Sequence, residues 1–140
     1  MLRFIPLLDP PMPLTVPLFL VHVSAGFPSP AEDYLEGPLD LNVHLIKKPA
    51  ATFFVRATGD SMRNVGIHSG DLLVVDRSLK ASNGRVVIAV VNGELTVKLF
   101  SLHSDGIYLM PANDQFEPIH ISEDADFEIW GIVTFVIHRV

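Results

Sequence analysis

Along most of this chain, apolar residues come in short runs separated by turn residues, a pattern typical of β-strands. Asp40 is placed to cap a short helical turn, which Pro49 would end. The apolar runs predict strands at 52–57, 72–75, 86–91, 94–100, 107–109, 118–121 and 129–138. Together these segments predict a mainly β, strongly bent antiparallel fold.

The clearest predicted element is a hairpin that turns at Asn92-Gly93. Asn-Gly between two apolar runs is a strong hairpin signal, because a type I′ turn needs two residues that tolerate positive φ. Counting outward from this turn gives the expected cross-strand pairs Val91–Glu94, Ala89–Thr96 and Val87–Lys98.

The first thirty residues differ from the rest of the chain. Their only charges are Arg3 and Asp9, and they hold seven of the eleven prolines: Pro6, Pro10, Pro11, Pro13, Pro17, Pro28 and Pro30. Proline is excluded from helix interiors and central strands, so the sequence predicts an extended, poorly ordered arm over 1–30. The predicted β domain then covers 31–140.

Part of this arm imitates a secretory signal, with an apolar stretch before the small residues Val23-Ser24-Ala25. Asp9 interrupts the segment, and Pro17 lies inside the only candidate for its apolar helix. No apolar run approaches the roughly 20 residues that span a bilayer. We therefore expect neither secretion nor a membrane partner.

Composition excludes several kinds of function. Half of the 140 residues are apolar (49%), which is enough for one domain with a core, and the formal net charge is −6. An acidic chain without a Lys/Arg cluster repels a phosphate backbone, so no direct nucleic-acid binding is expected. A role in nucleic-acid metabolism would have to run through a protein partner.

The chain has no cysteine, which excludes disulfides, thiolate zinc sites and a cysteine nucleophile. This composition fits a reducing cytosol, and we expect a cytoplasmic protein. The six histidines show no spacing typical of metal ligands, so neither a metal nor another cofactor is predicted.

Lys98 is unusual because it lies within the apolar run 95–100. It shares a strand face with Thr96 and Phe100. One interpretation is a lysine on the solvent face of a half-buried hairpin. The other is a lysine whose pKa is lowered by burial, because a neutral amine can act as a general base.

Ser61 offers a group for such a base to deprotonate. It follows the strand 52–57 in the turn Gly59-Asp60-Ser61-Met62, which can aim neighbouring N–H groups at one point, as in an oxyanion hole. The alternative is a residue that caps a short helix. Gly-Asp-Ser also occurs in a lipase/esterase family, but that family's DxxH pattern is missing from this chain.

Five collinear segments resemble the LexA/UmuD family of self-cleaving serine–lysine peptidases, and its UmuD-like branch with plasmid-borne relatives in particular. The resemblance covers over four-fifths of the chain, and the segments are 25–31, 40–42, 57–62 with 66–67, 69–76 and 93–98. The spacing from Ala25-Gly26 to Ser61 and on to Lys98 is more specific than any single motif.

This resemblance implies a fold of the LexA/UmuD C-terminal catalytic type and a site of known roles. Ser61 would be the nucleophile and Lys98 its general base, with the scissile bond between Ala25 and Gly26. The backbone N–H groups at Asp60 and Ser61 would bind the oxyanion. Small residues around the scissile bond also suit close approach of a backbone to a serine, and intramolecular delivery removes the need for a separate substrate pocket.

The resemblance also implies partners. Family members of this branch cleave themselves on the RecA–single-stranded DNA filament during the SOS response to DNA damage. The trimmed product forms a homodimer and joins a Y-family polymerase catalytic subunit (UmuC-like) in error-prone translesion synthesis.

Three other functions were weighed against this one. A LexA-type repressor needs a helix-turn-helix domain before the scissile bond, and only 25 residues precede it here. A signal peptidase shares the serine–lysine pair but needs a membrane anchor. A scaffold that never cleaves would not require both Ser61 and Lys98.

The segment 129–137 bears on the oligomeric state, because it is apolar on both strand faces. We expect a partner protomer to cover an exposed edge of this strand in a two-fold dimer. The alternative is that the strand is central to the monomer's own sheet.

Overall fold

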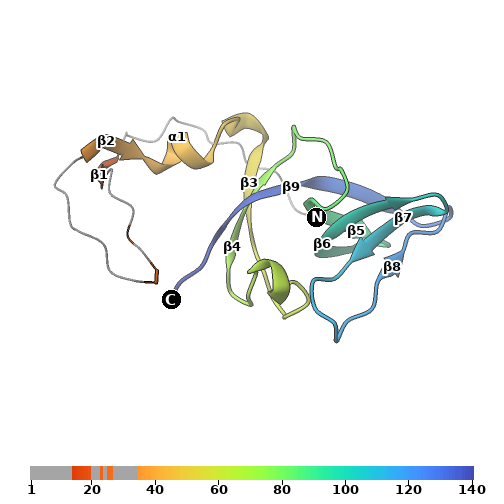
Figure 1. Ribbon diagram of the computed structural model, residues 1–140. Helices are drawn as coiled ribbons and strands as arrows, with labels where there is room; N and C mark the ends of the chain where they lie inside the picture. Colours follow the sequence, from red (N-terminus) through yellow and green to blue (C-terminus); the bar gives the residue numbers. More distant parts are fainter. Residues whose placement is uncertain (1–13, 20–22, 24, 27–34) are drawn as a thin grey trace. The chain divides into compact units, whose positions relative to one another are not determined.

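The computed structural model describes residues 14–19, 23, 25–26 and 35–140. The chain divides between Lys47 and Lys48 into two compact units, which are treated separately here. The N-terminal unit contains β1 (Thr15–Phe19), β2 (Leu35–Asp40) and α1 (Leu41–Leu45). The sheet domain comprises residues 48–140 (Figure 1).

In the N-terminal unit, β1 and β2 form a two-stranded antiparallel sheet in which Pro17 lies opposite Pro38. Among the residues described, each strand pairs along one edge only, and the missing N–H of proline is tolerated on the other edge. The pairing of β1 with β2 was not predicted. Most of the arm predicted over 1–30 lies outside the described residues, and its end at residue 30 stays a prediction.

The predicted cap of the short helix is confirmed. The Asp40 carboxylate accepts a hydrogen bond from the backbone N–H of Asn42 at 2.9 Å, and α1 ends at Leu45, before Pro49. This contact satisfies one of the N–H groups that the first turn of a helix leaves unpaired.

The sheet domain confirms the predicted fold class, because it is built on one seven-stranded antiparallel sheet. The strands lie in the order β3-β4-β9-β5-β6-β7-β8. Bulges beside Val74 and Ile88 interrupt the pairing of β9 with both of its neighbours and add to the bending. The elements are η1 (Pro49–Ala51), β3 (Thr52–Arg56), η2 (Arg63–Val65), β4 (Leu72–Asp76), β5 (Val86–Val91), β6 (Glu94–His103), β7 (Gly106–Met110), β8 (Ile119–His120) and β9 (Phe127–Ile137).

The β5–β6 hairpin has the predicted register. Asn92 and Gly93 have φ values of 49° and 85°, as a type I′ turn requires. All three predicted cross-strand pairs are present: Val91–Glu94, Ala89–Thr96 and Val87–Lys98.

The expectation for the C-terminal strand was wrong. β9 lies between β4 and β5, so both of its hydrogen-bonding edges are paired within the chain. No partner protomer is needed to cover an edge, and the alternative of a central strand is confirmed. Burial on both faces is also limited to the first part of β9, because Phe135 and Ile137 are 37% and 45% exposed.

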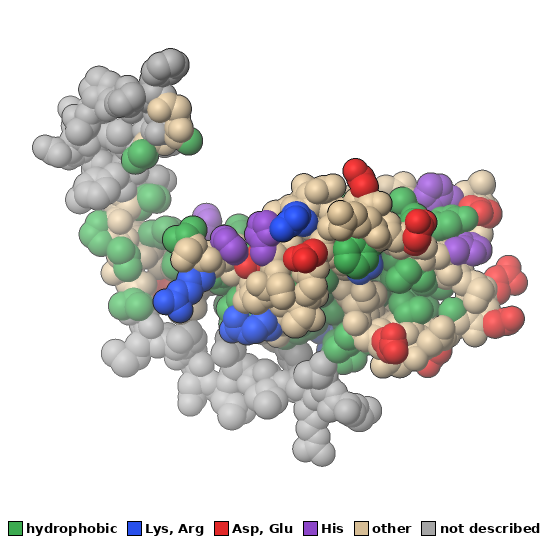
Figure 2. Space-filling view, turned by 90° about the horizontal axis from the view of Figure 1, so that it is seen from below, with side chains coloured by type: hydrophobic (Ala, Val, Ile, Leu, Met, Phe, Trp, Pro, Cys, Tyr) green, Lys and Arg blue, Asp and Glu red, His purple; other side chains and the backbone are tan. Residues whose placement is uncertain are grey.

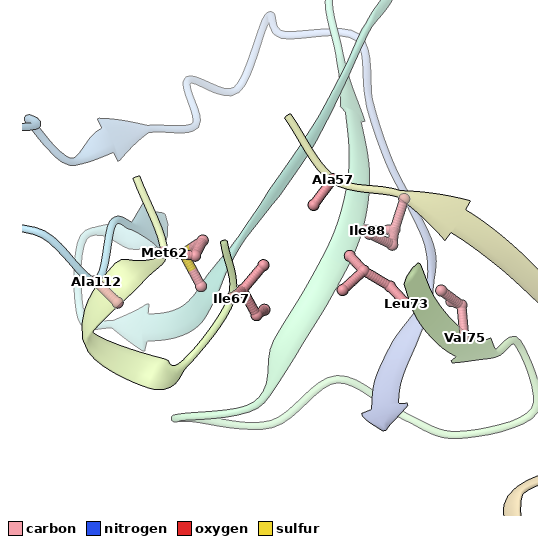
Figure 3. Close-up of a cluster of buried hydrophobic side chains, with 7 residues drawn as sticks. All are labelled: Ala57, Met62, Ile67, Leu73, Val75, Ile88 and Ala112. Atoms are coloured by element: carbon pink, nitrogen blue, oxygen red, sulfur yellow. The ribbon is translucent and has the colours of Figure 1, made fainter. Parts of the chain in front are cut away.

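Two apolar clusters form the core of the sheet domain. The first cluster is drawn in Figure 3 and consists of Ala57, Met62, Ile67, Leu73, Val75, Ile88 and Ala112. The second cluster consists of Val87, Ala89, Phe100, Leu109 and Ile132. Adjacent residues of β5 contribute to different clusters, as expected of a central strand whose side chains alternate between two covered faces.

Gly131 in β9 lies where the sheet leaves no room for a side chain. An added Cβ would lie 2.6 Å from Val75 Cγ1 and 3.0 Å from the backbone oxygen of Asp76. Because β4 would have to shift, Gly131→Ala should lower the free energy of unfolding by about 1–3 kcal/mol. Urea unfolding followed by circular dichroism measures this change.

The matched control is Glu128→Ala, at an exposed position of the same strand. It should change the free energy of unfolding by no more than about 0.5 kcal/mol. Equal stability of the Gly131→Ala variant and the wild type would contradict the proposed crowding.

Candidate active site

Ser61 lies in the turn that follows β3. The ladder between β3 and β4 continues as far as Ala57, whose N–H donates to the Asp71 carbonyl at 2.8 Å. The chain then leaves the sheet at Gly59, which adopts a left-handed φ of 88° and donates its N–H to Ser69 Oγ at 3.2 Å. This turn places Ser61 outside the sheet, as the sequence predicted.

Lys98 in β6 lies directly beside Ser61. Its Nζ is 2.8 Å from Ser61 Oγ, 3.1 Å from Thr96 Oγ1 and 3.1 Å from the carbonyl oxygen of Val97. The structure therefore brings together the two side chains that the sequence singled out as nucleophile and base. Thr96 was not assigned a role from the sequence, although its position two residues before Lys98 on one strand face was the signal that could have identified it.

Burial changes the chemistry of this lysine. Lys98 is about half-buried, and its desolvation lowers the pKa of the amine from the ordinary value of 10.5. A neutral amine has two N–H donors and one lone pair. The donors can serve Thr96 and the Val97 carbonyl, which leaves the lone pair to accept the proton of Ser61.

The pair opens into a cleft with a volume of about 270 Å³. Residues of β3 to β6 form most of its wall, which combines apolar side chains with the polar residues Arg56, Thr58 and Thr96. The apolar residues that line it are Val55, Ala57, Leu73, Ile88, Leu95 and Val97. Partial burial of the amine in this cleft is the cause of its desolvation.

The predicted oxyanion donors lie in the same turn. The N–H of Ser61 donates to no acceptor within the described part of the chain, and Ser61 is one of the residues that line the cleft. The use of this group and of the Asp60 N–H for an oxyanion stays a prediction.

Ala25 and Gly26 belong to the N-terminal unit, where both are exposed and lie in a bend. Exposure and a bend suit a peptide bond that must enter a cleft. Their role as the scissile pair stays a prediction, as do the roles of Ser61 and Lys98.

A buried carboxylate, that of Asp71, lies close to the segment that carries Ser69. The Asp71 carboxylate is buried, accepts the N–H of His68 at 2.8 Å and lies 2.6 Å from Nδ1 of His138. These two hydrogen bonds hold the pKa of Asp71 below its ordinary value of 3.8. Asp71 thereby connects the start of β4 to the residue that follows β9.

Among the residues described, no His, Asp or Glu side chains form a group of three that could hold a metal ion. No helix among those residues is both long and apolar enough to cross a membrane.

Comparison with protein families gives one match, to a family described as Peptidase S24-like, over residues 17–134. The chain belongs to this family. The match covers the serine turn, the β5–β6 hairpin and most of β9, and it confirms the resemblance to LexA/UmuD-type peptidases. The assignment of individual residues to the reaction remains a separate question.

Individual relatives are similar over most of their length. Protein SamA of Salmonella typhimurium is 50% identical over 129 residues, which cover 92% of this chain and 89% of the relative. Protein ImpA of Escherichia coli is 49% identical over 125 residues (88% and 83%), and Protein MucA of Escherichia coli is 46% identical over 121 residues (86% and 82%).

A repressor is also among the relatives. The LexA repressor of Xylella fastidiosa is 42% identical over 113 residues, which cover 81% of this chain but only 53% of the repressor. SamA, ImpA and MucA are similar to this chain over a larger share of the chain and over a larger share of their own length.

Proposed function

We propose that this Peptidase S24-like chain is a serine endopeptidase that cleaves itself between Ala25 and Gly26. The observation that carries this proposal is the 2.8 Å contact between Lys98 Nζ and Ser61 Oγ in a partly desolvated cleft. A serine hydroxyl is a weak nucleophile at its own pKa, and a neutral amine at hydrogen-bond distance is a base suited to activate it.

The reaction begins when Lys98 takes the proton of Ser61 and Oγ bonds to the carbonyl carbon of Ala25. The N–H groups at Ser61 and Asp60 stabilise the resulting oxyanion. Lys98 returns its proton to the nitrogen of Gly26, and the peptide bond breaks to leave Ala25 as an ester on Ser61. A water molecule, deprotonated by Lys98, then hydrolyses the ester and releases Ser61.

The substrate is a segment of the protein itself. Delivery of a tethered bond replaces a bimolecular encounter, so a modest cleft without a specificity pocket is sufficient. Ala25 and Gly26 are small enough to bring their backbone close to Ser61.

The cellular role proposed here is that of a UmuD-like accessory protein in SOS mutagenesis. Similarity to SamA, ImpA and MucA over most of the chain supports placement in the UmuD-like branch. In that role, the RecA–single-stranded DNA filament in the cytoplasm activates cleavage, and the trimmed homodimer joins a Y-family polymerase catalytic subunit.

Contact with nucleic acid is expected to run through these partners. Acidic side chains gather at the end of the sheet domain that holds β7 and β8 (Figure 2). Residues 99–138 include no lysine or arginine and seven carboxylates: Asp105, Asp114, Glu117, Glu123, Asp124, Asp126 and Glu128. Such a surface repels a phosphate backbone.

The first prediction concerns the products of cleavage. Purified protein incubated at alkaline pH, or with activated RecA at neutral pH, should give a fragment that begins at Gly26. Ser61→Ala should abolish this fragment, because it removes the nucleophile with little change in volume. Intact mass measures the products, and Ser104→Ala, at an exposed serine, is the matched control. Cleavage by the Ser61→Ala variant would refute the nucleophile, and an intact wild type would favour a non-cleaving scaffold.

The second prediction concerns pH. Because only the neutral amine accepts a proton, the rate of self-cleavage should rise with pH through the lowered pKa of Lys98 and level off below the ordinary value of 10.5. Lys98→Arg should be inactive, since a guanidinium stays charged at any usable pH. Lys80→Arg, at an exposed lysine, should cleave like the wild type. A flat pH–rate profile would exclude Lys98 as the base.

The homodimer is proposed to form through one face of the sheet. Phe54 and Phe135 both pair with Val74, so their side chains share a face, and Ile137 lies on the same face of β9. Phe54, Phe135 and Ile137 are 51%, 37% and 45% exposed. An exposed apolar face of this kind suits a self-complementary contact between two copies.

Light scattering at micromolar concentration should give twice the mass of one chain in both forms: twice 15.4 kDa before cleavage, and twice the smaller mass of residues 26–140 after it. Phe135→Asp and Ile137→Asp should each shift the mass toward the monomer, because a buried unpaired carboxylate is costly. Leu102→Asp, at an exposed residue of β6, should leave the mass unchanged. A monomeric wild type contradicts the homodimer, and dimeric aspartate variants place its interface elsewhere.

A further inference from the structure

The segment that follows β7 is joined to the serine turn by hydrogen bonds. The Ala112 N–H donates to the Ser61 carbonyl at 2.7 Å, and the Asn64 N–H donates to the Ala112 carbonyl at 2.7 Å. Asn113 adds a side-chain contact, in which Nδ2 donates to the carbonyl oxygen of Asp60 at 2.8 Å. Three contacts thus connect residues 60–64 with residues 112–113.

The Asn113 amide is held at both ends. While Nδ2 binds Asp60, Oδ1 accepts the backbone N–H of Gln115 at 3.0 Å. This second contact sets which end of the amide faces the serine turn, because only the NH₂ end can donate to a carbonyl. The loop after β7 therefore presents a fixed donor to Asp60.

The Asp60 carbonyl and the Ser61 N–H belong to the same peptide unit. This unit is planar and trans, so its C=O and N–H point in opposite directions. A donor that fixes the direction of the Asp60 carbonyl therefore also fixes the direction of the Ser61 N–H. That N–H donates to no acceptor among the described residues.

We propose that Asn113 is a positioning residue that holds the Asp60–Ser61 peptide so that the Ser61 N–H can bind the oxyanion. This inference rests on the self-cleavage proposed above and adds a residue from a distant loop to it. Asn113 acts through the peptide and does not touch the reacting atoms.

Asn113 is not the only residue that holds the serine turn, so its loss is expected to slow self-cleavage without abolishing it. The Arg63 N–H also donates to the Asp60 carbonyl, but over a longer distance of 3.2 Å. Met62, the next residue after Ser61, is anchored beside Ala112 in the first core cluster (Figure 3). Without the Asn113 amide the turn would stay folded, while the peptide that precedes Ser61 would gain freedom to rotate.

The test compares pH–rate profiles of self-cleavage for the full chain and its variants. Asn113→Ala removes the donor, and Asn113→Asp keeps the shape and the acceptor for Gln115 while it removes the donor. Both should lower the plateau rate by about 10- to 100-fold, less than the loss of a whole oxyanion donor. The midpoint of the Asn113→Ala profile should stay at the wild-type pH, since the contacts of Lys98 are unchanged.

Gln115→Ala and Gln115→Glu are the matched controls, because they make the same changes in the same loop without touching Asp60. Both should keep the wild-type plateau. A wild-type plateau in both Asn113 variants, or a fall matched by the Gln115 variants, would overturn the inference. So would a shifted midpoint in Asn113→Ala, because it would mean that the lysine itself had been disturbed.

The same experiments distinguish a failure of the proposed self-cleavage from a failure of the role given to Asn113. If Ser61→Ala still cleaves, or the wild type does not, the proposed reaction and this inference fall together. If cleavage depends on Ser61 and Lys98 but not on Asn113, only the role of Asn113 is refuted. Circular dichroism melting of each variant establishes that the rates belong to folded protein.

Discussion

The hydrogen bond between Lys98 and Ser61 forms only if most of the sheet domain is folded correctly, because it joins side chains 37 residues apart in the sequence. The β5–β6 register must be correct, since a slip by one residue would turn Lys98 to the opposite face. The β3–β4 ladder must end where it does, since Ser61 has to leave the sheet at the level of the amine. Strand β9 links these two strand pairs by lying between β4 and β5. The hydrogen bond between Lys98 and Ser61 thus depends on the backbone pairing of β3, β4, β9, β5 and β6.

The turn that carries Ser61 places one polar side chain in the cleft and the next, apolar side chain in the core. Met62 is 2% exposed and packs in the first core cluster, while its neighbour Ser61 lines the cleft. Burial of a side chain as large as methionine contributes on the order of 1.5–3 kcal/mol to stability and holds the turn against the core. Backbone contacts from Ala112 hold the same turn from another side. Ser61 is thereby held by its neighbours, although it lies on a connecting segment and not on a strand.

Local signals in the sequence were sufficient for the local parts of this structure. Asn92-Gly93 determined a turn and hence a register, and Asp40 determined a helix start, because each effect acts within a few residues. The neighbours of β9 could not be predicted, since alternation of side chains reveals faces and not partners. The approach of Lys98 to Ser61 is equally non-local, and only the spacing shared with a known family indicated it. Nothing in the sequence indicated a role for Asn113, because its side chain binds a backbone carbonyl, and every residue carries one.

The three acceptors around Lys98 Nζ have a consequence for the charged form of the amine. An ammonium group has three N–H donors, and Ser61 Oγ, Thr96 Oγ1 and the Val97 carbonyl accept all of them. In this form the serine oxygen receives a hydrogen bond, so no basic lone pair faces its hydroxyl proton. While the amine is charged, Lys98 therefore makes all of its hydrogen bonds but cannot act as a base. Loss of one proton would give this amine a basic lone pair without any change in the backbone pairing of the sheet.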